Sequence, residues 1–219
     1  MMPLKVSKAS GEASRLLTMP DSDEVSAGLL CFDIGNVLIK LGTSMRAVGP
    51  VANIEALEQL YCRYGVGELE SAVFFRELLR LSDWRGSVSE LRECFVHQRI
   101  LGVQPGVQEL FDELKALSIP LALLSNTNAA HWGYLAGFSL LKDCRYKLLS
   151  FEQECAKPDE EIFRRLEVQS GFSGAQILFF DDLERNVAVA RRLGWRAVHI
   201  KPENAVLQMR EFLCQQRVL

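Results

Sequence analysis

Short apolar runs alternate with longer amphipathic stretches along most of the chain. The first run, residues 29–34 (LLCFDI), is too short for a helix and has no polar face, which is typical of a strand buried on both sides. Comparable runs predict four more strands, at 119–125, 146–150, 177–182 and 195–200. Helical periodicity predicts helices between them, at 105–117, 158–168 and 183–194. This order predicts a doubly wound, Rossmann-like α/β fold with a parallel sheet.

Punctuating residues suggest where these helices begin and end. Pro105 and Pro158 are predicted to open two of them, because proline suits the first helical turn. Acidic residues directly after Pro158 and arginines further on match the helix dipole. Gly194 is predicted to end the third helix.

Three amphipathic helices with no strand between them interrupt the alternation. They are predicted at 51–65, 68–81 and 87–101. We therefore expect residues 42–103 to form a small helical cap inserted into an α/β core of residues 28–41 and 104–219. The insertion carries five aromatic residues whose helical spacing favours a packed interior over a substrate-binding box: Tyr61, Tyr64, Phe74, Phe75 and Trp84. Residues 1–27 are rich in small and polar residues and are predicted to be a flexible extension.

Composition narrows the class of protein. A chain of 219 residues with 48% hydrophobic residues can bury a core without covalent staples. The net charge of −3 argues against nucleic-acid binding, and no apolar run is long enough to span a membrane. The six cysteines form no C-x-x-C pair, so we expect reduced, mostly buried thiols and a cytoplasmic protein.

Polar residues cluster where the predicted strands end. These features are Asp33–Asn36, Ser125–Asn128, Lys157 and the pair Asp181–Asp182. Taken singly, each has a simpler interpretation as a turn, a helix cap or a surface lysine. The carboxyl ends of parallel strands meet at one edge of a sheet, however, which is where such folds bind ligands.

Taken together, these residues predict a magnesium and phosphate site. Asp33, Asp181 and a backbone carbonyl near Gly35 offer the oxygen ligands that Mg²⁺ prefers. The Ser125 hydroxyl and the amides that follow it suit phosphate oxygens, and Lys157 adds positive charge. Asp33 is then placed to attack phosphorus and form an aspartyl-phosphate.

Four motifs in this order resemble the haloacid dehalogenase (HAD) superfamily over about residues 29–201. They are FDIGNVL, LLSNTN, KPD and FFDD. Their details are most similar to the sugar-phosphatase branch related to α-D-glucose-1-phosphate phosphatase, and to the phosphatase domain fused to some epoxide hydrolases. The resemblance implies a Mg²⁺-dependent phosphatase with a helical cap, acting on a small-molecule phosphate ester.

The resemblance also implies roles for individual residues. Asp33 is the expected nucleophile. Asp33, the main-chain oxygen of Gly35 and Asp181 are expected to hold Mg²⁺, with Asp182 binding directly or through water. A separate set is expected to hold the phosphoryl group: Ser125, the Asn126 backbone and Lys157.

Gly35 departs from the superfamily's usual pattern. Most of its phosphatases carry a second Asp there, which protonates the leaving alcohol and later activates water. Such help contributes about 10²–10⁴-fold in rate. Three outcomes are possible. Another group acts as the general acid and base, for which His131 and Glu68 are candidates, or the substrate has a leaving group that departs easily, as a sugar 1-phosphate does. In the third case the chain is not a catalyst.

Two alternatives to the phosphatase follow from this departure. Metal-independent dehalogenases of the superfamily also lack the second Asp, but they do not typically carry a pair like Asp181–Asp182. A non-catalytic binding protein with this fold has no need of the nucleophile Asp33.

Overall fold

The computed structural model has a central sheet of five parallel strands, in the order β5–β4–β1–β6–β7. It describes residues 27–42 and 53–219. The sheet strands are β1 (Leu29–Phe32), β4 (Leu121–Ser125), β5 (Tyr146–Leu149), β6 (Ile177–Asp181) and β7 (Arg196–His199). All five lie within the predicted runs, and the doubly wound α/β fold is confirmed.

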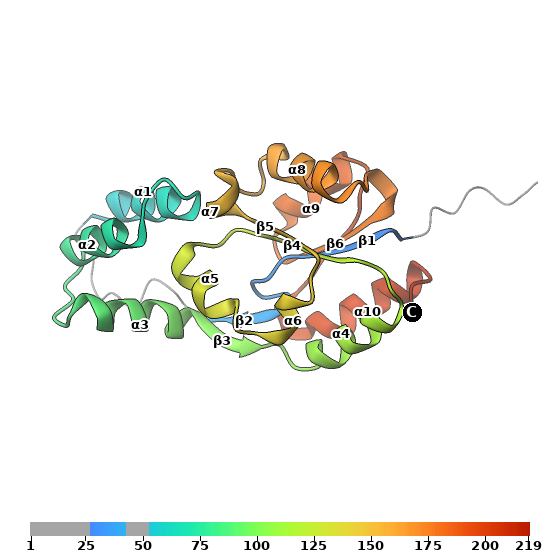
Figure 1. Ribbon diagram of the computed structural model, residues 1–219, viewed down its shortest axis with the longest axis horizontal. Coiled ribbons are helices and arrows are strands. Elements are labelled where there is room, and N and C mark those ends of the chain that lie inside the picture. Colours follow the sequence, from blue (N-terminus) through green and yellow to red (C-terminus); the bar gives the residue numbers. More distant parts are fainter. Residues whose placement is uncertain (1–26, 43–52) are drawn as a thin grey trace, which may run out of the picture.

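Helices cover both faces of the sheet (Figure 1). One face packs against α8 (Glu160–Ser170) and α9 (Glu184–Arg192), and the other against α4 (Val107–Ala116) and α10 (Ala205–Gln215). Side chains of β1 alternate between the two layers: Leu30 and Phe32 join the α4 and α10 side, whereas Leu29 and Cys31 join the other. The strand is therefore buried on both faces, as its uninterrupted apolar sequence predicts.

Shorter elements complete the core. They are α5 (Ala129–Leu135), α6 (Ser139–Lys142), α7 (Ser150–Gln153) and two 3₁₀ turns, η2 (Gly174–Gln176) and η3 (Pro202–Asn204). No helix within the described residues is long and apolar enough to cross a membrane.

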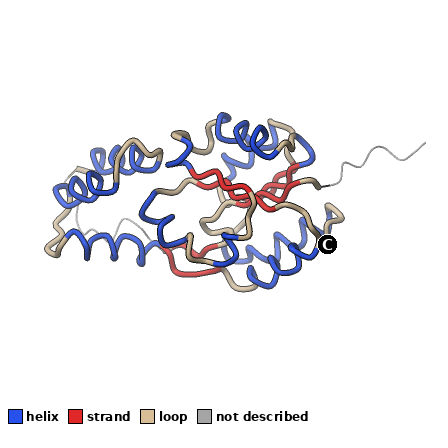
Figure 2. Tube along the Cα trace, viewed as in Figure 1, coloured by secondary structure: helices blue, strands red, loops and turns tan. Residues whose placement is uncertain are grey.

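A two-stranded antiparallel ribbon joins the core to the inserted helices (Figure 2). Its strands are β2 (Ile39–Leu41) and β3 (Ile100–Val103), and between them lie α1 (Ile54–Gly65), α2 (Ser71–Leu81) and α3 (Val88–Arg99). The prediction of a helix through residue 101 is wrong, and β2 was not predicted. Ile100 is buried and pairs with Leu41, so tertiary pairing outweighs the helical pattern there.

The inserted helices share an aromatic interior. Tyr64 stacks on Phe74 at a centroid distance of 3.9 Å, and Phe75 and Phe95 pack edge-on around them. The prediction of a packed interior is confirmed for Tyr64, Phe74 and Phe75. Tyr61 also touches Phe74 but lines a pocket described below.

Two helices begin later than their prolines suggest. Helix α4 begins at Val107 after Gly106, whose φ of +81° is left-handed. Helix α8 begins at Glu160, because the Asp159 side chain accepts a hydrogen bond from the Glu161 amide and serves as the cap. Each proline therefore lies two residues before the first helical residue.

All six cysteines are free thiols, as predicted. Only Cys31 and Cys144 are buried, so the expectation that most are buried is wrong. Cys62 and Cys214 lie on exposed faces of α1 and α10. The predicted flexible extension, apart from residue 27, and residues 43–52 of the predicted insertion lie outside the described residues.

Candidate active site

Strand register brings the predicted carboxylates together. Phe32 of β1 is aligned with Phe180 of β6, and the Asp33 amide donates to the Phe180 carbonyl at 2.9 Å. Asp33 and Asp181 each follow an aligned residue and therefore lie side by side. Oxygen atoms of Asp33, Asp181 and Asp182 all fall within 4.8 Å of one another, which is a possible metal site.

Lys157 lies between two of these carboxylates. Its Nζ is 2.9 Å from Asp33 Oδ1 and 2.6 Å from Asp181 Oδ2, and it also donates to the Leu124 carbonyl. Burial alone lowers the pKa of Lys157, but the charges of Asp33 and Asp181 outweigh it and raise that pKa above its usual value. The lysine is therefore a buried, permanently charged partner rather than a surface lysine.

Asp33 ionises less readily than an ordinary aspartate. Burial raises the pKa of its carboxyl to about 6, although Lys157 pulls it down, and Asp181 adds to the rise. The pKa of Asp182 is also raised by burial, against a hydrogen bond from Asn36. Three carboxylates around one ammonium leave an excess of negative charge that a divalent cation would offset.

The two adjacent aspartates have different surroundings. Asp181 Oδ1 accepts from the Leu183 amide at 2.8 Å and from Asn186 Nδ2 at 2.9 Å, while Oδ2 accepts from Lys157. Asp182 accepts at Oδ2 from Asn36 Nδ2 at 2.8 Å. Asp181, not Asp182, therefore meets the amide at the start of α9.

Asn186 is a site residue that sequence reasoning missed. It is buried on α9 and donates to both oxygens of Asp181. Its place one helical turn after the FFDD motif, on the face of α9 that packs against the core, is the signal that points to it.

The loop after β4 faces the pocket and also binds the backbone of Lys157. Asn126 Nδ2 donates to the Lys157 carbonyl at 2.7 Å, and the Lys157 amide donates to Asn126 Oδ1 at 2.8 Å. Ser125 is buried at the end of β4. Asn128 accepts from the His131 amide and so caps α5, which confirms the helix-cap interpretation for that residue alone.

Gly35 lies in a tight turn beside the carboxylates. The Asn36 amide donates to the Ile39 carbonyl at 2.7 Å, and Asn36 has a left-handed φ of +57°. No backbone hydrogen bond among the described residues uses the Gly35 carbonyl. Gly35 lines a small cavity together with Ser125 and Arg99.

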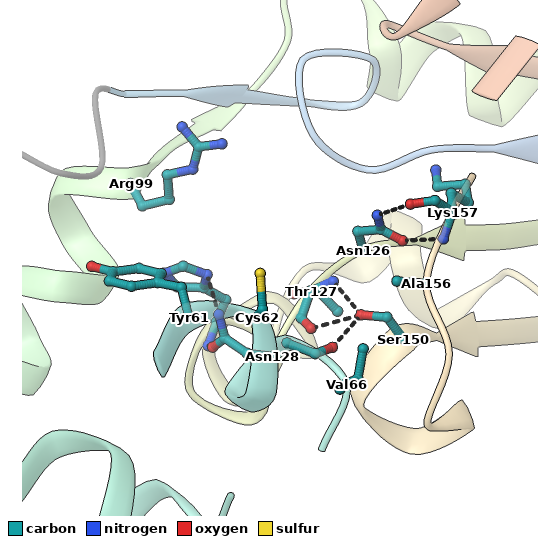
Figure 3. A pocket seen from close by; sticks show the side chains of 12 residues that line it. Tyr61, Cys62, Val66, Arg99, Asn126, Thr127, Asn128, Ser150, Ala156 and Lys157 are labelled. Carbon is teal, nitrogen blue, oxygen red and sulfur yellow. Dashed lines mark hydrogen bonds between the residues drawn. The ribbon is translucent and has the colours of Figure 1, made fainter. Parts of the chain in front are cut away.

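A larger pocket of about 420 Å³ lies between this edge of the sheet and the inserted helices (Figure 3). Tyr61 and Arg99 come from the inserted helices, and Asn126 and Lys157 from the core. Ser150, which sequence reasoning missed, joins the two parts. Its Oγ accepts from the Thr127 amide and shares its proton between the Gly65 and Thr127 carbonyls.

Neither sequence candidate for the missing acid is placed to donate a proton to a substrate at neutral pH. His131 lines the pocket, but burial lowers its pKa to about 4, and its ring stacks on Phe95 at 4.5 Å. Its Nδ1 accepts from Asn128, which leaves Nε2–H directed at the Phe95 carbonyl. Glu68 is exposed, pairs with Arg63, and precedes α2 rather than starting it.

Comparisons with known proteins find similar hydrolases. The human protein magnesium-dependent phosphatase 1 is 29% identical over 99 residues, which are 44% of this chain and 53% of that protein. The match thus spans about half of that relative's length. A HAD family enzyme of Bacteroides thetaiotaomicron, solved with magnesium and inorganic phosphate, has a TM-score of 0.71 at 24% identity, over 81% of this chain and 96% of that one.

A more distant solved structure is a 2-haloacid dehalogenase of Pseudomonas syringae pv. Tomato DC3000. It has a TM-score of 0.61 at 18% identity, over 86% of this chain and 99% of that one. At these identities both solved structures show the fold alone. Residues 28–194 match the haloacid dehalogenase-like hydrolases, which confirms the superfamily that the four motifs predict and leaves the narrower branch a prediction. The chain therefore belongs to the haloacid dehalogenase-like hydrolase family.

Proposed function

We propose that the protein is a Mg²⁺-dependent phosphatase that hydrolyses a small phosphate ester through an aspartyl-phosphate on Asp33. One observation carries this proposal: three carboxylates with oxygens within 4.8 Å of one another, of which two pair with the ammonium of Lys157, lie at the carboxyl edge of a parallel sheet. Such a cluster is electrostatically incomplete without a cation. The names of the human relative and of the Bacteroides thetaiotaomicron complex support magnesium and phosphate as the missing partners.

Asp33, Asp182 and the Gly35 carbonyl are the proposed metal ligands. Asp33 uses Oδ1 for Lys157, and Asp182 uses Oδ2 for Asn36, so each keeps one oxygen for coordination. Asp181 already accepts hydrogen bonds at both oxygens. Its proposed role is to hold Lys157 and to add negative charge beside the metal. Bound Mg²⁺ would lower the repulsion between the Asp33 carboxylate and an anionic substrate.

Ser125, the Asn126 backbone and Lys157 are the proposed phosphoryl-binding groups. The Ser125 hydroxyl takes part in no side-chain hydrogen bond among the described residues, so it is free to donate to a phosphoryl oxygen. The Asn126 side chain fixes the Lys157 backbone and thereby the place of its ammonium.

The proposed reaction has two steps. An Asp33 oxygen forms a bond to phosphorus as the bond from phosphorus to the ester oxygen breaks, and the leaving oxygen takes a proton from water. Water then attacks the phosphorus of the aspartyl-phosphate, which releases inorganic phosphate and restores the carboxylate. The helices α1–α3 act as a cap that excludes bulk water during both steps.

The leaving group is proposed to depart without a strong acid from the protein. Gly35 supplies no carboxyl group, and His131 is neutral at pH 7. A sugar 1-phosphate suits such a site, because its anomeric oxygen is a better leaving group than an ordinary alcohol. Faster turnover of primary-alcohol phosphates than of anomeric phosphates would contradict this part of the proposal.

The dehalogenase alternative is disfavoured by the same cluster. A metal-free hydrolase gains nothing from Asp182, whose carboxyl is partly buried next to two others and raises the pKa of Asp33. The similarity to a dehalogenase structure concerns the fold alone.

The test is hydrolysis of a panel of phosphate monoesters, including sugar 1-phosphates, with Mg²⁺ and with a chelator. We expect phosphate release that requires Mg²⁺. Halide release from 2-chloropropionate in the presence of the chelator, without any phosphate release, would instead support the dehalogenase.

A further inference from the structure

The pocket beyond the carboxylates contains a second cation. Among the described residues that line it, only Arg99 and Lys157 carry a full charge at neutral pH. Lys157 is neutralised by Asp33 and Asp181, whereas Arg99 takes part in no ion pair among the described residues. The guanidinium is therefore the one lining charge without a direct counter-ion in this part of the structure.

Arg99 is partly buried and fixed in place. It is the last residue of α3, at the junction with β3, and its Nη1 donates to the Gly42 carbonyl at 2.6 Å. Burial lowers the pKa of Arg99, while the negative charges of Asp182 and Asp33 favour its charged form. A guanidinium has five N–H donors, so one bond to a carbonyl leaves capacity for a planar anion.

Arg99 lies across the larger pocket from Lys157 and also borders the small cavity that Gly35 and Ser125 line. Figure 3 shows Arg99 and Tyr61 on one side of the pocket, and Asn126 and Lys157 on the other. The buried hydroxyl of Tyr61 has no hydrogen-bond partner among the described residues. Because this hydroxyl is closed off from solvent, a ligand in the pocket meets Arg99 rather than the Tyr61 hydroxyl.

The rest of the lining favours an anion over a cation. No carboxylate lines the pocket among the described residues, and the polar groups present are neutral amides and hydroxyls. His131 beside them is neutral, because burial and the charge of Arg99 lower its pKa. A leaving group with a positive charge would meet Arg99 without a compensating acid.

We propose that Arg99 is a specificity residue that binds a second anionic group, a carboxylate or phosphate, on the leaving group of the substrate. This inference rests on the proposed phosphatase function, because the first anion is the phosphoryl group held at Lys157. It also narrows the sugar 1-phosphates that fit the pocket to those carrying a further acidic group.

The test compares substrates that differ in one charge. We choose 3-phosphoglycerate and glycerol 3-phosphate, because the first carries a carboxylate where the second carries a hydroxymethyl group. The kcat/KM ratio of the two is measured with Mg²⁺ for the wild type, Arg99→Gln, Arg99→Lys and Arg92→Gln. Arg92 is an exposed arginine on the same helix and serves as the matched control.

We expect the wild type to favour 3-phosphoglycerate by about tenfold or more, the usual size of a hydrogen bond between charged groups. The ratio should fall to near one in Arg99→Gln, recover in part in Arg99→Lys, and stay at the wild-type value in Arg92→Gln. A wild-type ratio of one or less, or a ratio that Arg99→Gln leaves unchanged, would overturn the proposal.

A binding measurement separates this inference from the phosphatase proposal. Calorimetric titration with phosphonoacetate and with ethylphosphonate, neither of which is a phosphate ester, reports the second anion site without turnover. Suppose that no ester is hydrolysed, but phosphonoacetate binds about tenfold tighter than ethylphosphonate and Arg99→Gln removes that preference. The anion site is then supported and the phosphatase proposal fails. Equal affinities for both phosphonates overturn the anion site, whatever the turnover.

Discussion

Leu41 occupies the space that a side chain at Gly35 would need. A Cβ atom at position 35 would lie 2.7 Å from Leu41 Cδ1, well inside van der Waals contact. Leu41 lies on β2, the strand whose partner β3 follows directly from Arg99. A side chain at position 35 therefore requires the end of the Leu41 side chain to shift.

A double-mutant cycle tests this packing. We expect Gly35→Asp to destabilise the protein by about 1–3 kcal/mol, because Leu41 must move to make room. Leu41→Ala alone removes apolar contacts, but in the Gly35→Asp background it also relieves the overlap. Urea unfolding of the four proteins should give a favourable coupling of about 1 kcal/mol or more. Additive effects would show that Leu41 does not obstruct position 35.

Lys157 should be essential for the stability of the metal-free protein. Lys157→Met leaves Asp33 and Asp181 without their cation, and removing one partner of a buried pair costs about 3–5 kcal/mol. The loss should shrink as the pH falls from 8 to 5, since protonation removes the unpaired charge. Lys115→Met, at an exposed lysine, is the control and should change little at either pH. A loss that does not depend on pH would point to packing instead.

His131 makes stability depend on pH with a definite sign. Its pKa is about 4 in the folded protein and 6.5 when unfolded, so the unfolded state binds the proton first. The neutral imidazole stabilises the fold above pH 6.5, and that stability is lost as the pH falls towards 4. The difference in unfolding free energy between wild type and His131→Phe should change by about 3 kcal/mol across this window. A constant difference would mean that His131 is not buried in its neutral form.

The two adjacent aspartates should respond differently to the loss of charge. Asp182→Asn should weaken Mg²⁺ binding by about tenfold or more, measured by calorimetry, because it removes a proposed ligand. Asp181→Asn should reduce the free energy of unfolding more strongly, since Asp181 accepts from Lys157 and Asn186. If Asp181→Asn had the larger effect on Mg²⁺ affinity and the smaller one on stability, the assignment of their roles would be reversed.

The sequence predicts the centre of the sheet well because β1, β4 and β6 are buried along their whole length. Runs such as 177–182 leave no room for a polar helical face, so apolar continuity identifies them. The ribbon escapes prediction because β2 has three residues and β3 follows α3 without a break. Nothing local marks Ile100 as a strand residue, since its partner Leu41 lies about sixty positions away.

The site, like the fold, has parts that the sequence predicts and parts that it does not. Asp33 and Asp181 are predictable because topology alone brings strand ends together, and Lys157 is predictable from its motif in the loop before α8. The bond from Asn126 to the Lys157 backbone and the contact of Ser150 with Gly65 depend on how loops fold in three dimensions. Asp181 binds Lys157 and Asp182 binds Asn36 because the two side chains point in different directions. Two neighbouring aspartates in a sequence do not reveal these directions.

Trapping of the covalent intermediate is the most direct test of the central claim. Acid quench during turnover of a ³²P-labelled phosphate ester should leave label on the wild-type protein, in a bond that hydroxylamine cleaves, and only when Mg²⁺ is present. The account predicts that peptide mapping finds this label on Asp33 and that Asp33→Asn carries none. Turnover without a labelled protein, or label that persists in Asp33→Asn or in the presence of a chelator, would contradict it.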